Sequence, residues 1–418
     1  MVRKWEGVIG RHKSVVSCGC ICLAFIVIAM FLFAAPGAAQ QKGGEAKILK
    51  IGGLICLTGW FSSMDLQMGN ELILLQDMIN EKGGIDIKGQ KYKIEVVIED
   101  CKSTLDGVTA AATSLASKGI KFTVGPAAFF ASASAPITTR NKMIDVLGYN
   151  ILSPEQIGPN QPYAFAGLGG AGARTLSGIK LMKTKFPQVK NLCMVSPAGG
   201  INKPLEAFLR QNLAAAGYNI VGEWVIFPDD ASEWSSFAAK INANKQADAV
   251  FWLNCITFHV GNMLKSLREI GYDKWVFAWS NAPCADVMKI TGPDAAQKLV
   301  TQAFTPGSKE NPPELEALMK RSQAKYGANV PLYFETACPL GILVDMIQKA
   351  QSTDPVVVKK KWESMDGQTV SSLFGPAIIS GTKTYHIKGH GLSHAHPNQI
   401  LDKGVVTDAG WAEAGPLP

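Results

Sequence analysis

Side chains able to bind a small polar molecule gather in short segments that each follow an apolar run of this 418-residue chain. The candidate ligand-binding residues are Trp60, Ser63, Phe129, Phe130, Ser132, Tyr149, Asn150, Thr257, Trp279 and Asn281. Aromatic rings supply flat apolar walls, and hydroxyls or backbone N–H groups at a helix start bind a carboxylate. The residue types therefore predict a site that holds a small molecule with an apolar or aromatic body, where Arg174 or backbone amides could bind an anionic group.

No arrangement typical of an enzyme accompanies these residues. The chain contains no Gly-x-Ser-x-Gly elbow and no Walker loop. No strand is predicted directly before the Gly-rich segment 167–173, as a dinucleotide site would require. We therefore expect a binding protein that has no catalytic residues and no cofactor.

Four of the six histidines crowd the segment 386–396. Their spacing is not that of a zinc site, which needs three or four ligands in fixed geometry. We expect solvated loop histidines here and no metal site.

Elements of alternating type must position the candidate residues. Apolar and β-branched runs predict strands at 47–55, 92–98 and 120–124, and apolar residues at helical spacing predict helices at 68–80 and 106–117. Strands that alternate with helices favour a parallel sheet, which takes up ligands at the carboxyl ends of its strands. The segments 57–65, 100–104 and 125–132 should therefore border a site.

A second unit repeats the plan after Phe165. Its predicted strands are 191–195, 220–226, 249–253 and 275–278, and its predicted helices are 205–216, 234–242 and 260–270. Long helices at 312–326 and 333–349 follow.

Several short segments carry a resemblance to a known family. They are Leu57-Thr58-Gly59, Ile79-Asn80-Glu81-Lys82-Gly83-Gly84-Ile85, Glu99-Asp100, and Gly125-Pro126 followed by Ser132 and Pro136. Through them, roughly residues 47–400 resemble the type I periplasmic solute-binding proteins of the leucine/isoleucine/valine-binding class, which serve ABC importers.

The resemblance implies an α/β fold of two doubly wound lobes with mainly parallel sheets, joined by a hinge of three crossings near Phe165, Phe304 and Gly375-Pro376. Lobe 1 is expected at 40–165 and 305–375, and lobe 2 at 166–304 and 376–418. The implied function is solute binding by hinge closure, as a monomer that delivers its solute to membrane permease subunits. A ligand sensor built on the same fold is the alternative use.

The chain departs from the family where family members read an amino-acid head group. Phe129 replaces a carboxylate-binding Ser, and Gly169-Gly170 and Asn281 fall where acidic residues would bind an ammonium. A buried ammonium without a carboxylate partner is unfavourable by several kcal/mol. A carboxylate is therefore expected in preference to a branched-chain or other amino acid, which is the alternative ligand.

The N-terminal segment predicts export. Residues 1–39 combine basic residues, an apolar core and a small-x-small site at Gly37 and Ala39, as in a cleaved signal peptide of a periplasmic protein. An uncleaved membrane anchor is the alternative. Removing this segment takes away four basic residues and one acidic residue, which lowers the net charge from +7 to +4. That charge is too small to suggest a nucleic-acid partner.

Six cysteines follow residue 39, and none lies in a CxxC spacing. Cys56 and Cys101 follow neighbouring strands of the first unit, and Cys255 and Cys284 do so in the second. Disulfides between these pairs and free buried thiols are both compatible with the sequence.

Overall fold

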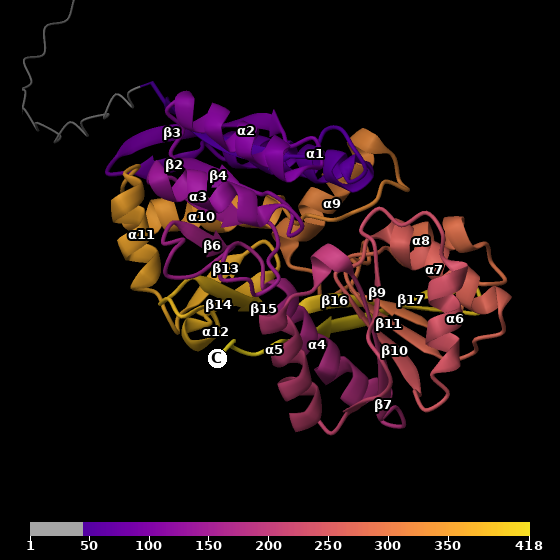
Figure 1. The fold of residues 1–418 in the computed structure, drawn as a ribbon. Helices are drawn as coiled ribbons and strands as arrows, with labels where there is room; N and C mark the ends of the chain where they lie inside the picture. Colours follow the sequence, from indigo (N-terminus) through magenta and orange to yellow (C-terminus); the bar gives the residue numbers. More distant parts are fainter. Residues whose placement is uncertain (1–44) are drawn as a thin grey trace, which may run out of the picture. The chain divides into compact units, whose positions relative to one another are not determined.

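The computed structural model describes residues 45–418 (Figure 1). The N-terminal part of these residues builds a mainly parallel sheet. The strand order is β2-β3-β1-β4-β5-β6, and only β2 runs antiparallel to its neighbour. The strands are β1 (Lys47–Ile55), β2 (Ile85–Ile87), β3 (Gln90–Asp100), β4 (Phe122–Val124), β5 (Ile144–Leu147) and β6 (Ala164–Ala166). The predicted signal peptide and its cleavage site lie outside the described residues.

Helices cover both faces of this first sheet. On one face α2 (Leu105–Ser117) packs against α3 (Ala131–Arg140). On the other, α1 (Ser62–Glu81) contacts α9 (Pro313–Tyr326) and α10 (Ala337–Ala350), and α11 (Pro355–Glu363) packs on α10. The late helices therefore return to the sheet that the first third of the chain builds.

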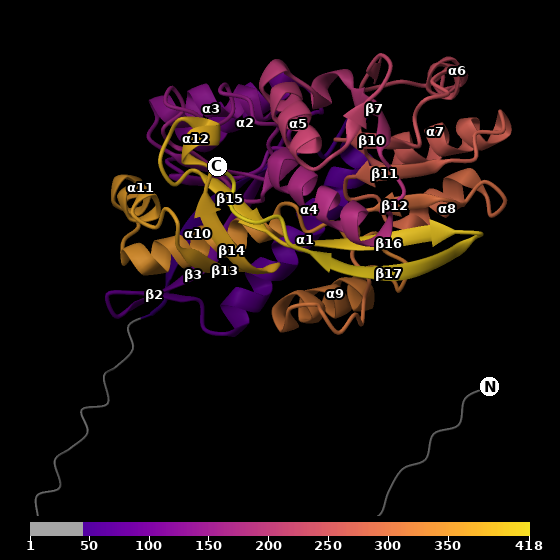
Figure 2. The ribbon, with the colours of Figure 1, turned by 90° about the horizontal axis from the view of Figure 1, so that it is seen from below.

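The second sheet has the order β17-β16-β12-β11-β10-β7-β8, with β9 also paired to β7. Its strands are β7 (Asn191–Pro197), β8 (Asn219–Ile220), β9 (Val225–Phe227), β10 (Ala249–Leu253), β11 (Trp275–Trp279), β12 (Leu299–Thr301), β16 (His396–Asp402) and β17 (Val405–Ala412). Figure 1 shows its helices in two groups, which are α4 (Gly170–Lys185) with α5 (Lys203–Ala215), and α6 (Ser235–Ala243) with α7 (Thr257–Glu269) and α8 (Cys284–Thr291). Figure 2 shows β16 and β17 as a long antiparallel pair.

A small antiparallel sheet precedes that pair. It joins β13 (Thr369–Ser372), β14 (Gly375–Ser380) and β15 (Gly391–His394), and the short helix α12 (Thr382–Tyr385) lies between β14 and β15. The crossing expected near Gly375-Pro376 therefore falls inside β14. The chain joins the second sheet at β16.

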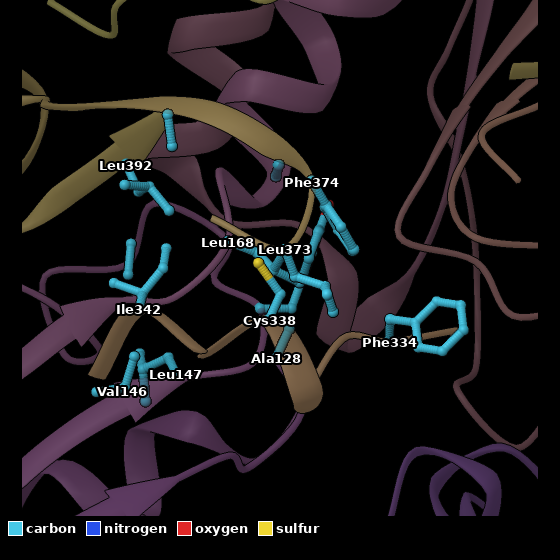
Figure 3. Close-up of a cluster of buried hydrophobic side chains, with 14 of the residues drawn as sticks. Ala128, Val146, Leu147, Leu168, Phe334, Cys338, Ile342, Leu373, Phe374 and Leu392 are labelled. Carbon is cyan, nitrogen blue, oxygen red and sulfur yellow. The ribbon is translucent and has the colours of Figure 1, made fainter. Parts of the chain in front are cut away.

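The apolar core extends from the first sheet through α10 to the small sheet. Figure 3 shows Ile342 of α10 between Val146 and Leu147 of β5 and Leu392 of β15. All four side chains are fully buried. Burial of each side chain contributes about 1.5–3 kcal/mol. Helix α10 therefore links the first sheet to the small sheet through packed apolar side chains.

The mainly parallel α/β class is as predicted, but several element boundaries differ from those expected. The predicted strand 220–226 is split into β8 and β9, because Gly222 between them has φ of 70°, which an extended strand does not allow. The predicted helix 333–349 begins only at Ala337, and the helix predicted at 68–80 begins earlier, at Ser62. Within residues 45–418, no helix has both the length and the apolar character needed to cross a membrane.

The two glycines that end α1 offer a test of this packing. Gly83 and Gly84 both have positive φ, but a Cβ at Gly84 would lie 2.0 Å from the Tyr92 carbonyl oxygen, whereas one at Gly83 meets nothing within 4 Å. Gly83→Ala should destabilise by about 1–2 kcal/mol through backbone strain alone. Gly84→Ala should destabilise by at least about 3 kcal/mol. Urea unfolding midpoints measure the difference, and equal midpoints would contradict this account.

Candidate ligand-binding site

A pocket lies where strands of both sheets end, and its empty space, open solvent included, is about 380 Å³. Its walls follow β1, β4 and β5 of the first sheet and β7, β10 and β11 of the second, all at carboxyl ends of parallel strands. The lining residues are Phe61, Met64, Ala127, Ala128, Phe129, Tyr149, Arg174, Gly200, Asn254, Cys255, Ile256, Ser280 and Glu335.

Aromatic packing builds the wall on the side of the first sheet. The rings of Trp60 and Phe61 contact those of Phe129 and Phe130, with centroids 5.5–6.0 Å apart in edge-on or tilted geometry. Each such pair contributes about 0.5–1.5 kcal/mol beyond its buried area. Because the rings support one another, Phe61 and Phe129 present a fixed apolar surface to the pocket.

A buried ion pair crosses the pocket. The Nη2 group of Arg174, in α4, donates to Oε1 of Glu335, which lies just before α10. Arg174 is only 5% exposed. Burial raises the pKa of Glu335, and the guanidinium of Arg174 opposes that rise. The pair therefore adds one positive and one negative charge to the pocket, which cancel.

A series of polar contacts lies beside the ion pair. The Arg174 guanidinium lies 4.7 Å from the centre of the Tyr149 ring, a cation–π contact. The Tyr149 hydroxyl donates to Oδ1 of Asn254 at 2.6 Å, and Nδ2 of Asn254 donates to the carbonyl oxygen of Gly200. Asn254 adopts φ of 58°, a conformation that Asn tolerates better than most residues. These contacts join residues that follow β5, β7 and β10.

Spare hydrogen-bond donors also face this region. Within residues 45–418, the N–H groups of Ala127, Ala128 and Phe129 have no hydrogen-bond partner, and neither has Nε of Arg174. The three backbone groups precede α3, where the helix dipole favours a negative charge.

Helix α1 holds the segment that carries Glu335. Buried Glu71 accepts hydrogen bonds from the backbone N–H groups of Tyr333 and Phe334, and Thr336 donates to the Met68 carbonyl oxygen. Nearer the start of α1, Asp65 accepts a hydrogen bond from the N–H of Cys56. Burial raises the pKa of Asp65 to about 7 and that of Glu71 to about 8.

The predicted ligand-binding residues divide into two groups around this pocket. Phe129 and Tyr149 line it, while Trp60 and Phe130 support the aromatic wall from behind. Ser63 is exposed and Ser132 is half-buried, both outside the lining.

The other four predicted residues have different surroundings. Asn150 is buried and accepts a hydrogen bond from Tyr385, and Thr257 begins α7. Trp279 is fully buried and stacks on Phe277, so it belongs to the core. Asn281 lines a smaller cavity on another side of Arg174. The ligand contacts of all ten residues stay predictions.

Sequence reasoning missed Glu335, Asn254 and Met64. The helix predicted over 333–349 contains Glu335, whereas the observed helix starts after it. The signal for this later start is Pro339. Proline is tolerated in the first turn of a helix, so Pro339 indicates a start near Ala337 and leaves Glu335 in the preceding loop. No local pattern marks Asn254 or Met64 as pocket residues.

The expectation of solvated histidines is wrong for three of the four. His390, His394 and His396 are buried at 0–3% exposure because β15 and β16 carry this segment into the interior. Burial lowers the pKa of His394 to about 4. Among residues 45–418, no group of three or more His, Cys, Asp or Glu side chains is arranged to hold a metal ion.

Fold and pocket define a two-sheet α/β binding protein, and comparison with known proteins gives its family. The profile of the periplasmic binding protein family matches residues 48–392. The chain belongs to this family, whose members are solute receptors and not enzymes.

Solved structures of low sequence identity share the fold. A leucine-binding protein from Thermotoga maritima has a TM-score of 0.69 at 16% identity, over 87% of this chain and 99% of that one. A branched-chain amino acid transporter binding protein from Streptococcus pneumoniae, in complex with isoleucine, has 0.68 at 17%, over 88% and 100%. A solute-binding protein of an ABC transporter from Rhodopseudomonas palustris, in complex with 3,4-dihydroxybenzoic acid, has 0.64 at 20%, over 87% and 98%.

The buried carboxyl of Asp65 predicts a dependence of stability on pH. Its pKa rises from the ordinary 3.8 to about 7 on folding, mainly through burial. Between these values the folded state keeps a proton that the unfolded state releases, so this contribution to stability is full below about pH 4 and is lost as pH rises through 7.

Between pH 5 and 8, the Tm of the wild type should therefore fall by about 2–4 °C more than the Tm of Asp65→Asn. Thermal unfolding at several pH values measures this difference. The exposed Asp294→Asn serves as the matched control and should follow the wild type. Parallel curves for Asp65→Asn and the wild type would show that Asp65 is ionised in the folded state.

Proposed function

We propose that this protein is the extracytoplasmic solute-binding component of an ABC importer, and that it holds a small organic carboxylate with an apolar or aromatic body. The observation that carries the proposal is an imbalance of hydrogen-bonding groups in the pocket. The N–H groups of 127–129 and Nε of Arg174 have no partner among the described residues, whereas Oδ1 of Asn254 and Oε1 of Glu335 already accept hydrogen bonds.

The occupied acceptors argue against an ammonium group. Glu335 is the one acid among the lining residues, and its Oε1 accepts from Arg174, so its charge is already paired. Oδ1 of Asn254 accepts from Tyr149, and the Cys255 carbonyl oxygen accepts from Ser280. An ammonium would have to share Glu335 with Arg174 and lie beside its positive charge, which is unfavourable in a buried site.

The spare donors suit a carboxylate. Two positions offer them, the N–H groups of 127–129 and Nε of Arg174. Hydrogen bonds to a charged group contribute about 1.5–3 kcal/mol each, so a few of them fix the orientation of a small anion. The apolar body would pack between Phe129 and Met64 on one side and Ile256 on the other.

The mode of action follows from the position of the pocket. Its walls come from both sheets, so a ligand that contacts both favours the arrangement in which they close on it. The closed form would then be presented to membrane permease subunits. The structural relatives support either ligand class, since one was crystallised with isoleucine and another with 3,4-dihydroxybenzoic acid.

Matched ligand pairs test the solute class. Thermal unfolding is measured with leucine against 4-methylpentanoate, and with phenylalanine against 3-phenylpropanoate, because each pair differs only in the α-ammonium. A ligand at about 100 times its Kd stabilises the folded protein by about 2.7 kcal/mol. We expect stabilisation by the carboxylates that lack the ammonium. Stabilisation by leucine or phenylalanine alone would overturn the proposed class and favour an amino-acid receptor.

Arg174 is expected to be the main cationic partner of the solute. Arg174→Gln should weaken the binding of a stabilising carboxylate at least about tenfold, because a charge-assisted hydrogen bond is lost. The exposed Arg210→Gln is the control and should bind normally.

A double variant separates binding from folding. Arg174→Gln alone leaves Glu335 buried and unpaired, which destabilises the fold. Arg174→Gln combined with Glu335→Gln removes both charges, so it should recover much of the stability but not the affinity. Calorimetric titration of a folded double variant that binds like the wild type would exclude Arg174 as the anion partner.

A further inference from the structure

Two buried cysteines, Cys56 and Cys101, lie side by side at the ends of neighbouring parallel strands. β1 and β3 pair up to Ile55 and Asp100, and the N–H of Cys101 continues the ladder by donating to the Ile55 carbonyl oxygen at 2.8 Å. Cys56 and Cys101 are therefore the next pair in this register. Neighbouring strands lie about 4.8 Å apart, within the Cα separation of about 4.4–6.8 Å that a disulfide requires.

Both side chains point to the same face of the sheet. Cys56 and Cys101 belong to the apolar cluster that contains Leu54 and Val108, whereas Ile55, which lies between Leu54 and Cys56 in sequence, packs in the core on the other face. Both cysteines are 0% exposed. The pKa of the Cys101 thiol is raised, first by its hydrogen bond with the Cys56 thiol and then by burial, which agrees with direct contact of the two thiols.

The other four described cysteines have separate surroundings. Cys284 contacts the hydroxyl of Thr301 at 3.4 Å, while Cys255 lines the ligand pocket. Cys193 lies beside Asn244, and Cys338 packs beneath the small sheet (Figure 3). Among residues 45–418, only Cys56 and Cys101 combine adjacent positions in a strand register with contact between their thiols.

The segments that carry these two cysteines also support the ligand pocket. Asp100 accepts hydrogen bonds from the N–H groups of Leu57 and Thr58. Ser103 donates to the Thr58 carbonyl oxygen and accepts from the N–H of Phe61, which lines the pocket. A covalent bond between the segments would hold the same arrangement without relying on these hydrogen bonds.

We propose that Cys56 and Cys101 form a disulfide under oxidising conditions, and that it fixes the wall of the pocket that carries Phe61. With glutathione disulfide as oxidant, a Cys thiolate attacks one of its sulfurs to give a mixed disulfide and one glutathione thiol. The second cysteine then displaces the other glutathione as a thiol. One glutathione disulfide is consumed and two glutathione thiols are released for each protein disulfide, so electrons and protons balance. Cross-linking constrains the unfolded chain most when the closed loop is long, as it is here.

Peptide mapping of the full chain tests the bond directly. The protein is reduced and unfolded, then refolded either with a reduced and oxidised glutathione mixture or with a thiol reductant, alkylated, and digested with trypsin. We expect a linked pair of peptides, residues 51–82 with residues 94–102, only in the oxidised sample. Alkylation of both Cys56 and Cys101 in the oxidised sample, or their linkage to other cysteines, would overturn the proposal.

Thermal unfolding provides an independent measurement. The oxidised protein should unfold about 3–8 °C above the reduced protein. This difference should vanish in Cys56→Ala and Cys101→Ala and persist in Cys284→Ala, which removes a thiol of equal burial outside the pocket. Loss of the difference in Cys284→Ala alone would assign the redox effect to a different cysteine.

Discussion

The buried contact between Arg174 and Glu335 is the interaction on which the pocket depends. It joins α4, which covers the second sheet, to the segment before α10, which packs on the first. Such a pair adds little net stability, because desolvation of both charges offsets their attraction. Removing one partner destabilises the fold strongly, because it leaves the other charge buried and unpaired. The pair therefore fixes the positions of its two side chains more than it stabilises the fold.

Glu335 is held in place by the backbone on either side of it. The carboxylate of Glu71 accepts the N–H groups of Tyr333 and Phe334, and Thr336 bonds to α1. These contacts satisfy polar groups of a loop that is buried and so cannot bond to water. They also explain why an acidic side chain of α1 lies in the interior. Helix α1 thus sets the position of the acid that neutralises Arg174.

The sequence predicted the fold more fully than the site. Strand and helix alternation depends on local patterns of apolar residues, which are visible in a single chain, so both sheets and most of their helices were found. The site depends on which loops meet. Phe129 and Tyr149 follow strands directly and were identified, whereas Glu335 reaches the pocket from a segment far along the chain. Phe258 and Trp279 are aromatic like the rings of the pocket wall, yet Phe258 is 47% exposed and Trp279 is fully buried. Residue type alone therefore does not identify the rings that line the pocket.

The balance of donors and acceptors, more than net charge, sets the chemistry of the pocket. Arg174 and Glu335 cancel, so the site attracts neither cations nor anions by simple charge. Three of its oxygens, Oδ1 of Asn254 and the carbonyl oxygens of Cys255 and Gly200, already accept hydrogen bonds from Tyr149, Ser280 and Asn254. The N–H groups before α3 remain unused within the described residues and point from a helix start, where negative charge is favoured. A group that brings acceptors gains hydrogen bonds there, whereas a group that brings donors must first break existing ones. The same walls would therefore hold an apolar body equally well in either case, and the polar end of the solute decides which molecules bind.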